Sequence, residues 1–156
     1  MRPRDGALTV KVVVSRVSRA SVSVDGACVG AIGPGLLLLV AAAAGDRDET
    51  AAWMADRVAG MRIFPDDRGR MDRSLLDVGG EALVISQFTL VGDVSKGRRP
   101  SFIGAEAPAR ANLLVDAVAA GLRRLGVAKV DQGRFGADMK IDALHDGPVT
   151  ILLDRA

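Results

Sequence analysis

The sequence is poor in the residues that most metal centres and disulfides require. Its 156 residues include one cysteine, Cys28, and one histidine, His145. A single cysteine can form no internal disulfide, and a lone histidine cannot build a His-rich metal site. We therefore expect no metal, a buried Cys28 that packs as a small apolar side chain, and a turn or surface position for His145.

Aromatic residues and long apolar runs are also scarce. There is no tyrosine, and aromatic residues make up 3% of the chain, which argues against a sheet that stacks RNA bases on aromatic rings. The run from Leu36 to Ala44 is much shorter than the about 20 residues that a membrane-spanning helix needs. Phosphate-binding glycine loops of the Walker or G-x-G-x-x-G type do not occur. We expect no cofactor, no membrane partner and a reducing, cytoplasmic location.

The chain does have enough apolar residues to form the core of one domain. Hydrophobic residues make up 49% and charged residues 26% of it, and its net charge is +2. This composition is typical of a globular domain and excludes a disordered or histone-like chain. Residues 1–9 are polar and turn-prone, so we expect a flexible extension there and a single domain over residues 10–156.

Hydrophobic spacing predicts strands in blocks, interrupted by two helices. The expected strands cover residues 9–17, 20–24, 28–32, 36–40, 82–86, 128–130, 139–144 and 149–153, and the strand at 82–86 runs directly into residues 87–90. The expected helices cover about 46–61 and 108–126, and turns or loops cover 25–26, 65–69, 92–104 and 145–148. Strict strand–helix alternation would indicate a doubly wound parallel sheet, and it is absent. The predicted fold class is therefore α+β, with a mixed sheet or partial β-barrel and two main helices.

Polar residues suited to chemistry follow the strand that ends near residue 86. Ser86, Gln87 and Thr89 lie where a strand exit offers free backbone N–H groups, although an ordinary strand end with polar caps has the same composition. A basic run with Lys96, Arg98 and Arg99 comes shortly afterwards, and such short runs are more often solvated than bound to phosphate. Acidic residues such as Asp46 are expected in solvated loops.

Four segments of the sequence, taken together, indicate a particular protein family. They are Ser86-Gln87-Phe88-Thr89-Leu90, Lys96-Gly97-Arg98-Arg99-Pro100-Ser101-Phe102, Gly133-Arg134-Phe135-Gly136-Ala137-Asp138-Met139 and Asp146-Gly147-Pro148-Val149-Thr150. In order and spacing they resemble the D-aminoacyl-tRNA deacylase family, and further similarity at residues 16–22 and 30–36 extends the resemblance from about Val10 to Leu153. Two departures are residues 1–9, which precede the family pattern, and His145, where the family commonly has Asn.

The resemblance implies an esterase that hydrolyses D-aminoacyl-tRNA and mischarged glycyl-tRNA and rejects L-aminoacyl-tRNA as a proofreading step. It implies a homodimer with active sites at the interface, in which one subunit supplies Ser86, Gln87, Phe88 and Thr89 and the other supplies a cis Gly147–Pro148 bond. The other implied site residues are Arg16, which would brace the Gly-Pro carbonyls, Phe135 and Met139 in the substrate pocket, and Lys96, Arg98 and Arg99 on tRNA phosphates. The implied partners are tRNA and a second copy, with no DNA.

Several alternatives remain open at this point. Ser86 or Thr89 could act as a nucleophile, but with no histidine placed to activate them we favour assistance by the 2′-hydroxyl of the terminal ribose. The Phe88 and Thr89 amides would then stabilise the developing oxyanion. The runner-up function is a non-catalytic RNA-binding or oligomeric interaction module. A relative specialised for L-alanine would be expected to alter the Ser86–Thr89 segment and Arg16, which are intact.

Overall fold

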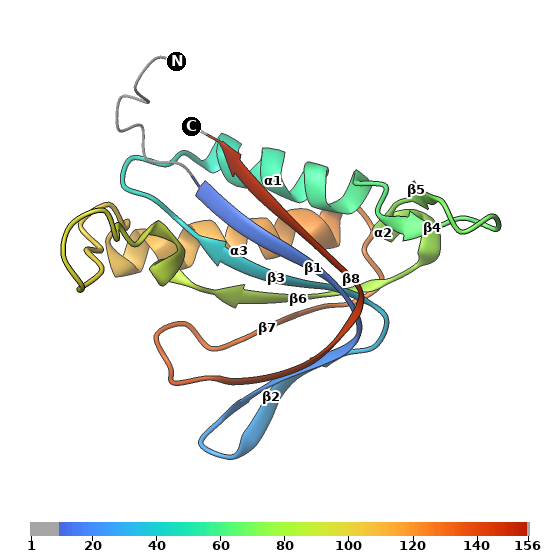
Figure 1. Cartoon of the computed structure of the whole chain (residues 1–156), viewed down its shortest axis with the longest axis horizontal. Coiled ribbons are helices and arrows are strands. Elements are labelled where there is room, and N and C mark those ends of the chain that lie inside the picture. The colour runs from blue at the N-terminus through green and yellow to red at the C-terminus, as the bar shows by residue number, and fades with distance from the viewer. Residues whose placement is uncertain (1–9, 156) are drawn as a thin grey trace.

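The computed structural model describes residues 10–155, in which a mixed sheet packs against helices (Figure 1). Its strands are β1 (Val10–Val24), β2 (Ala27–Ile32), β3 (Gly35–Ala41), β4 (Phe64–Pro65), β5 (Met71–Arg73), β6 (Glu81–Ser86), β7 (Val130–Gln132) and β8 (Lys140–Arg155). Its helices are α1 (Asp48–Gly60), α2 (Leu75–Val78), the 3-10 turn η1 (Phe88–Val91) and α3 (Pro108–Arg124). The α+β class is confirmed, with a nearly closed barrel. The expected extension at residues 1–9 lies outside the described residues.

The long strand β1 organises the sheet. Along one side it pairs with β8, and along the other it pairs first with β3 and then with β2, all antiparallel. The expected separate strands at residues 9–17 and 20–24 are in fact one strand of 15 residues. Its register against β8 shifts on both sides of Val17, and such irregularities let a strand bend without ending. One strand can therefore serve two parts of the sheet.

The two ends of the sheet, β2 and β7, approach each other and nearly close a barrel. The strand order is β2-β1-β3-β6-β7. Side chains join the two ends: the Asp131 carboxylate accepts from Ala31 N at 2.9 Å, and Lys129 Nζ donates to Ala31 O at 2.7 Å. A Cβ on Gly30 would lie 3.0 Å from Gln132 O, so glycine permits this approach. We call this junction the β2–β7 seam.

Two apolar cores hold the sheet. One fills the barrel and includes Val22, Leu83 and Ile85. The larger one lies between the sheet and the helices α1 and α3, where Met54 and Leu122 are fully buried. Both helices were expected from their apolar spacing, and both form. In Figure 1 they cover one face of the sheet.

Several local predictions were wrong. Residues 145–148 do not form a turn between two strands, because β8 continues through them and pairs with β1 at His145 and again at Thr150. The short helix α2 and the small β4–β5 ribbon were not expected; α2 begins with a capping box in which Ser74 and Asp77 bond each other's backbone N–H groups. Cys28 is exposed rather than buried, because it follows the tight turn at the tip of the β1–β2 hairpin.

Candidate active site

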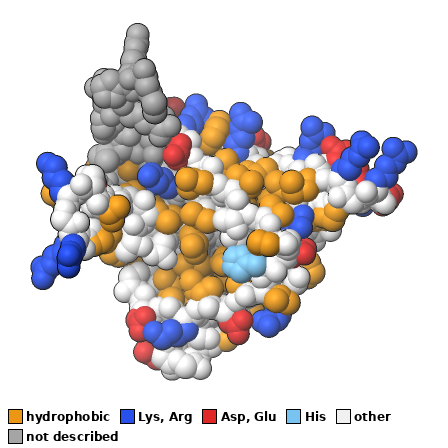
Figure 2. Space-filling view, viewed as in Figure 1, with side chains coloured by type: hydrophobic (Ala, Val, Ile, Leu, Met, Phe, Trp, Pro, Cys, Tyr) orange, Lys and Arg blue, Asp and Glu red, His pale blue; other side chains and the backbone are white. Residues whose placement is uncertain are grey.

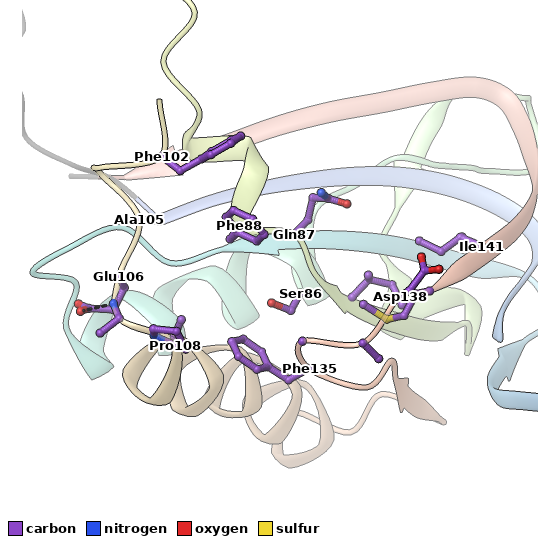
Figure 3. Close-up of a pocket in the computed structure, with 16 residues that line it drawn as sticks. Ser86, Gln87, Phe88, Phe102, Ala105, Glu106, Pro108, Phe135, Asp138 and Ile141 are labelled. Atoms are coloured by element: carbon purple, nitrogen blue, oxygen red, sulfur yellow. Dashed lines mark hydrogen bonds between the residues drawn. The ribbon is translucent and has the colours of Figure 1, made fainter. Parts of the chain in front are cut away.

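A pocket of about 660 Å³ opens at the carboxyl end of β6. Its walls come from the exit of β6 and η1, the start of α3, and the chain between β7 and β8 (Figure 3). It is lined by Ile85, Ser86, Gln87, Phe88, Phe102, Ala105, Glu106, Ala107, Pro108, Ala111, Phe135, Gly136, Ala137, Asp138, Met139 and Ile141. A mostly apolar pocket with a few polar groups is the usual form of a small-ligand site.

The exit of β6 brings three of the expected catalytic residues to the pocket. Ser86, Gln87 and Phe88 line it. The strand ends at Ser86, as the sequence predicts, and the chain then turns into η1, which was not predicted. The parallel partner β3 ends at Ala41, so this chain has no further ladder to join and forms local bonds instead, including Leu90 N to Gln87 O at 3.2 Å.

Thr89 lies apart from the pocket lining. Its side chain is exposed and its hydroxyl accepts a hydrogen bond from Gln87 Nε2. Phe88 and Phe102 pack edge to face with their ring centroids 5.2 Å apart and form one side of the pocket (Figure 3). The geometry therefore places Thr89 where it can position Gln87, outside the pocket wall.

Phe135 and Met139, expected in a substrate pocket, both line the pocket at the end of β6. Phe135 also packs against the helix-facing core, and Met139 packs against the barrel core. A Cβ on Gly133 would come within 2.6 Å of Met139 Sδ. The glycine therefore makes room for the methionine in this wall.

Gly147, Pro148 and Arg16 come together elsewhere in the fold. The Gly147–Pro148 bond is cis, and both residues are exposed. Arg16 is buried beneath them: Nη1 donates to Ile63 O at 2.7 Å and Nε donates to Asp146 O at 3.1 Å. The bonds of Arg16 thus reach the carbonyl just before Gly147. None of these residues lines the pocket of its own chain.

Lys96, Arg98 and Arg99 are exposed on a loop that leads into the pocket. The loop is closed by reciprocal backbone bonds between Asp93 and Ser101, of 2.7 and 2.8 Å. Hydrogen bonds from the side chain and backbone N–H of Ser95 lower the pKa of Asp93. The next residue after this closure, Phe102, lines the pocket.

Sequence reasoning missed the wall formed by Ala105, Glu106 and Ala107, and missed Asp138 as a lining residue. The available signal was Pro108, which marks the start of α3 and so predicts that an exposed connection ends there. Among residues 10–155, no group of His, Cys, Asp and Glu side chains is arranged to hold a metal ion. Within the same residues, no helix is long and apolar enough to cross a membrane.

Comparison with known proteins identifies the class. The family model described as D-Tyr-tRNA(Tyr) deacylase matches residues 13–154. The chain is 58% identical over 147 residues to a D-aminoacyl-tRNA deacylase of Thermomicrobium roseum, covering 94% of this chain and 95% of that protein. It is 56% identical to one of Roseiflexus sp., covering 94% of each.

Solved structures agree on the fold. A structure titled "c-Myc DNA Unwinding Element Binding Protein" superposes with a TM-score of 0.88 at 35% identity, covering 94% of this chain and 99% of that one. A probable eukaryotic D-amino acid tRNA deacylase superposes with a TM-score of 0.83 at 17% identity, covering 94% and 100%. At that identity the second likeness concerns the fold alone.

The chain is thus an enzyme, a hydrolase that acts on aminoacyl-tRNA. More particularly, it belongs to the D-aminoacyl-tRNA deacylase family, as its motifs suggested.

Proposed function

We propose that this enzyme removes D-amino acids, and glycine mischarged on tRNA, while sparing L-aminoacyl-tRNA, and that a second copy of the chain supplies the chiral filter. The supporting observation is the separation of two motifs. Ser86, Gln87 and Phe88 line a pocket, whereas Gly147 and Pro148 are exposed and lie outside it. A second copy could present its Gly147–Pro148 segment to this pocket.

An apolar face supports the proposed homodimer. Ile141, Leu144 and Leu152 of β8 are 39%, 49% and 60% exposed. Figure 2 shows hydrophobic side chains gathered around the single histidine on the face that carries β8. Contiguous exposed apolar surface of this kind marks an interaction site, and its occupant here would be the same face of a second copy.

The filter would act by exclusion. The Gly147–Pro148 backbone would occupy the volume that an L side chain needs, whereas a D side chain would point outward and glycine has none. Because rejection arises from a steric clash, it needs no favourable contact with the D side chain. The guanidinium of Arg16, bonded to Asp146 O and Ile63 O, would keep this backbone in place.

The chemical step would use water, the substrate's own 2′-hydroxyl and the backbone of η1. Water adds to the ester carbonyl and the carbon–oxygen bond to the ribose breaks. One proton of the water passes to the ribose oxygen, the other is released to solvent, and the amino acid leaves as a carboxylate. The first N–H groups of a helical turn have no partner within it, so those of Phe88 and Thr89 can donate to the developing oxyanion. Ser86 and Gln87 would orient the substrate.

The rest of the tRNA would approach along the basic loop. Lys96, Arg98 and Arg99 are exposed, and the loop joins the pocket at Phe102. Phosphate contacts of this kind position a nucleic acid without reading its sequence. We expect the protein to act in the cytoplasm, where its tRNA substrate is used.

The first test is to incubate the purified chain with D-aminoacyl-tRNA, its L counterpart and glycyl-tRNA and to follow the surviving ester of each. We expect rapid loss of the D and glycyl esters and survival of the L ester. Equal loss of D and L esters would contradict the chiral filter, and survival of all three would favour a non-catalytic RNA-binding module. Light scattering on the same sample should give the mass of two chains.

A further inference from the structure

The pocket has one wall that is neither helix nor strand. Residues 104–107 connect the basic loop to α3, and three of them line the pocket. The one β-bridge in this wall that the described structure records pairs Ala105 with Ala43. A short irregular segment needs partners for its backbone groups if it is to keep a fixed position.

The partners come from the chain that follows β3. Ala44 N donates to Gly104 O at 2.9 Å, and Glu106 N donates to Ala42 O at 3.1 Å. These bonds lie on either side of the Ala43–Ala105 bridge. They join the wall to residues 42–45, which themselves do not line the pocket.

Each oxygen of the Glu106 carboxylate accepts a hydrogen bond from a backbone N–H group. Oε2 accepts from Gly45 N at 3.1 Å, and Oε1 accepts from Ala107 N at 2.9 Å. Ala107 is the residue that precedes α3, and its methyl side chain cannot form a capping hydrogen bond. One carboxylate therefore joins the loop after β3, the wall and the helix start. In Figure 3 it lies at the end of the pocket beside Pro108.

A second carboxylate, that of Asp46, is buried and bonds the loop of residues 42–45. Asp46 was expected in solvent, but it is 8% exposed, and it accepts from Ala43 N at 2.6 Å. Burial is the main cause that raises its pKa, and the nearby Glu106 charge adds to the effect. Arg110 of α3 donates to Asp46 O at 3.2 Å and pairs with Asp48 at 3.2 Å. The loop is thereby fixed to both helices.

We propose that Glu106 is a positioning residue of the active site, which sets the place of the 104–107 wall and so the affinity for the end of the tRNA. This inference rests on the proposed function, since the wall would contact the terminal nucleoside. Glu106 acts through backbone groups, takes no part in proton transfer, and is assisted by Asp46. Its loss should weaken substrate binding and leave the chemical step intact.

The test compares Glu106→Gln with Glu49→Gln, which removes a carboxylate from the exposed first turn of α1. The two backbone N–H groups are bound by different carboxylate oxygens, and in glutamine one of these oxygens is replaced by an NH2 group, which donates and cannot accept. For Glu106→Gln we expect KM for D-aminoacyl-tRNA to rise about three- to tenfold, the size of one net hydrogen bond, with kcat within about twofold. Glu49→Gln should match the wild type in both constants.

Amide hydrogen exchange gives a readout that does not need substrate. Exchange at Ala44, Gly45 and Ala107 should be faster in Glu106→Gln than in Glu49→Gln, while the melting temperatures of the two variants agree. An unchanged KM in Glu106→Gln, or a fall in kcat that equals the loss in kcat/KM, would overturn the inference. If Glu106→Gln lowers the melting temperature well below that of Glu49→Gln, the role is general folding and the inference is also wrong.

The two proposals fail in different ways. Absence of D-selective hydrolysis in the wild type would reject the proposed function, whatever the exchange rates. Wild-type hydrolysis with an unchanged KM in Glu106→Gln would reject only the positioning role. Glu106→Asp provides a rescue arm: its carboxylate should restore at least part of the affinity, and failure to improve on Glu106→Gln would count against the brace.

Discussion

The Ser86–Phe88 segment and the Gly147–Pro148 segment are both motifs of the family, yet they have opposite surroundings. The first lies at the end of the buried strand β6 and faces a pocket built by its own chain. The second lies on the flanking strand β8, exposed and supported from below by Arg16. One chain thus keeps the two segments apart, and this separation supports our proposal that a second copy completes the site.

Replacing Gly147 should have the largest effect on the hydrolysis of D and L esters. Its φ is +124°, and a Cβ there would lie 3.0 Å from Val149 N and 3.1 Å from Arg16 Nη2. Strain of about 1–3 kcal/mol in the Gly-Pro segment corresponds to about a five- to 150-fold change. In Gly147→Ala we expect hydrolysis of the D ester to fall by that factor, or hydrolysis of the L ester to appear.

Gly69→Ala is the matched control for Gly147→Ala. Gly69 has a φ of +78° and open space around its Cβ position, in a turn far from the pocket lining. Rates for the D and L esters in this variant should equal those of the wild type. If both variants lose activity alike, the effect comes from backbone strain in general and the chiral filter is not supported.

Reversing the charges of the basic loop tests the path from the pocket to the tRNA body. In the triple variant Lys96→Glu, Arg98→Glu, Arg99→Glu, the affinity for tRNA at low salt should fall by about tenfold or more. The slope of log affinity against log salt should become shallower by about 0.7 for each lost contact with single-stranded phosphate. Hydrolysis of a D-aminoacyl-adenosine, which has no further phosphates, should not change.

Titration of tRNA at several salt concentrations measures this effect. A wild-type slope in the triple variant would mean that these side chains are merely solvated. The loop itself should stay closed, since its Asp93–Ser101 bonds are between backbone atoms.

The variant Arg16→Lys tests whether the hydrogen bonds of Arg16 position the backbone at Gly147. Lysine has one ammonium group, so it cannot bond Ile63 O and Asp146 O with the fork geometry of arginine. Loss of one net hydrogen bond predicts about a two- to tenfold decrease in the ratio of D to L hydrolysis. The ratio of initial rates on the two esters measures it, and a fully retained ratio would show that Arg16 does not position the filter.

Thr89→Ala should have the smallest effect. The side chain of Thr89 is exposed, outside the pocket lining, and bonded to Gln87. If the chemical step uses the η1 backbone and the substrate hydroxyl, kcat should stay within about threefold. A folded Thr89→Ala variant without activity would instead identify Thr89 as a nucleophile or proton carrier.

Sequence patterns predicted the elements whose burial follows directly from the spacing of their apolar residues. The helices α1 and α3 repeat apolar residues along one face, and the strand β3 is a continuous apolar run that is buried almost throughout. Irregular elements depend on partners far away in sequence. The turn at Phe88 forms where the neighbouring strands end, and β8 passes through residues 145–148 because β1 pairs with it on both sides of them.

The candidate site was predictable where a motif carries it and missed where tertiary bonds build it. Phe88, Phe135 and Met139 stand in motifs of the family, and the pocket includes them. In the sequence Glu106 has the features of an ordinary loop carboxylate, because the role we propose for it depends on bonds to Gly45 and Ala107. Burial of Asp46 depends in the same way on packing that no local pattern encodes.

The β2–β7 seam has a consequence for how the molecule behaves in solution. Open sheet edges can recruit further strands and lead to fibrils. Here the outer edge of β2 is occupied at Ala31 by Lys129 and Asp131, and β7 has only three residues. Stacking of barrels edge to edge through β2 and β7 is therefore disfavoured.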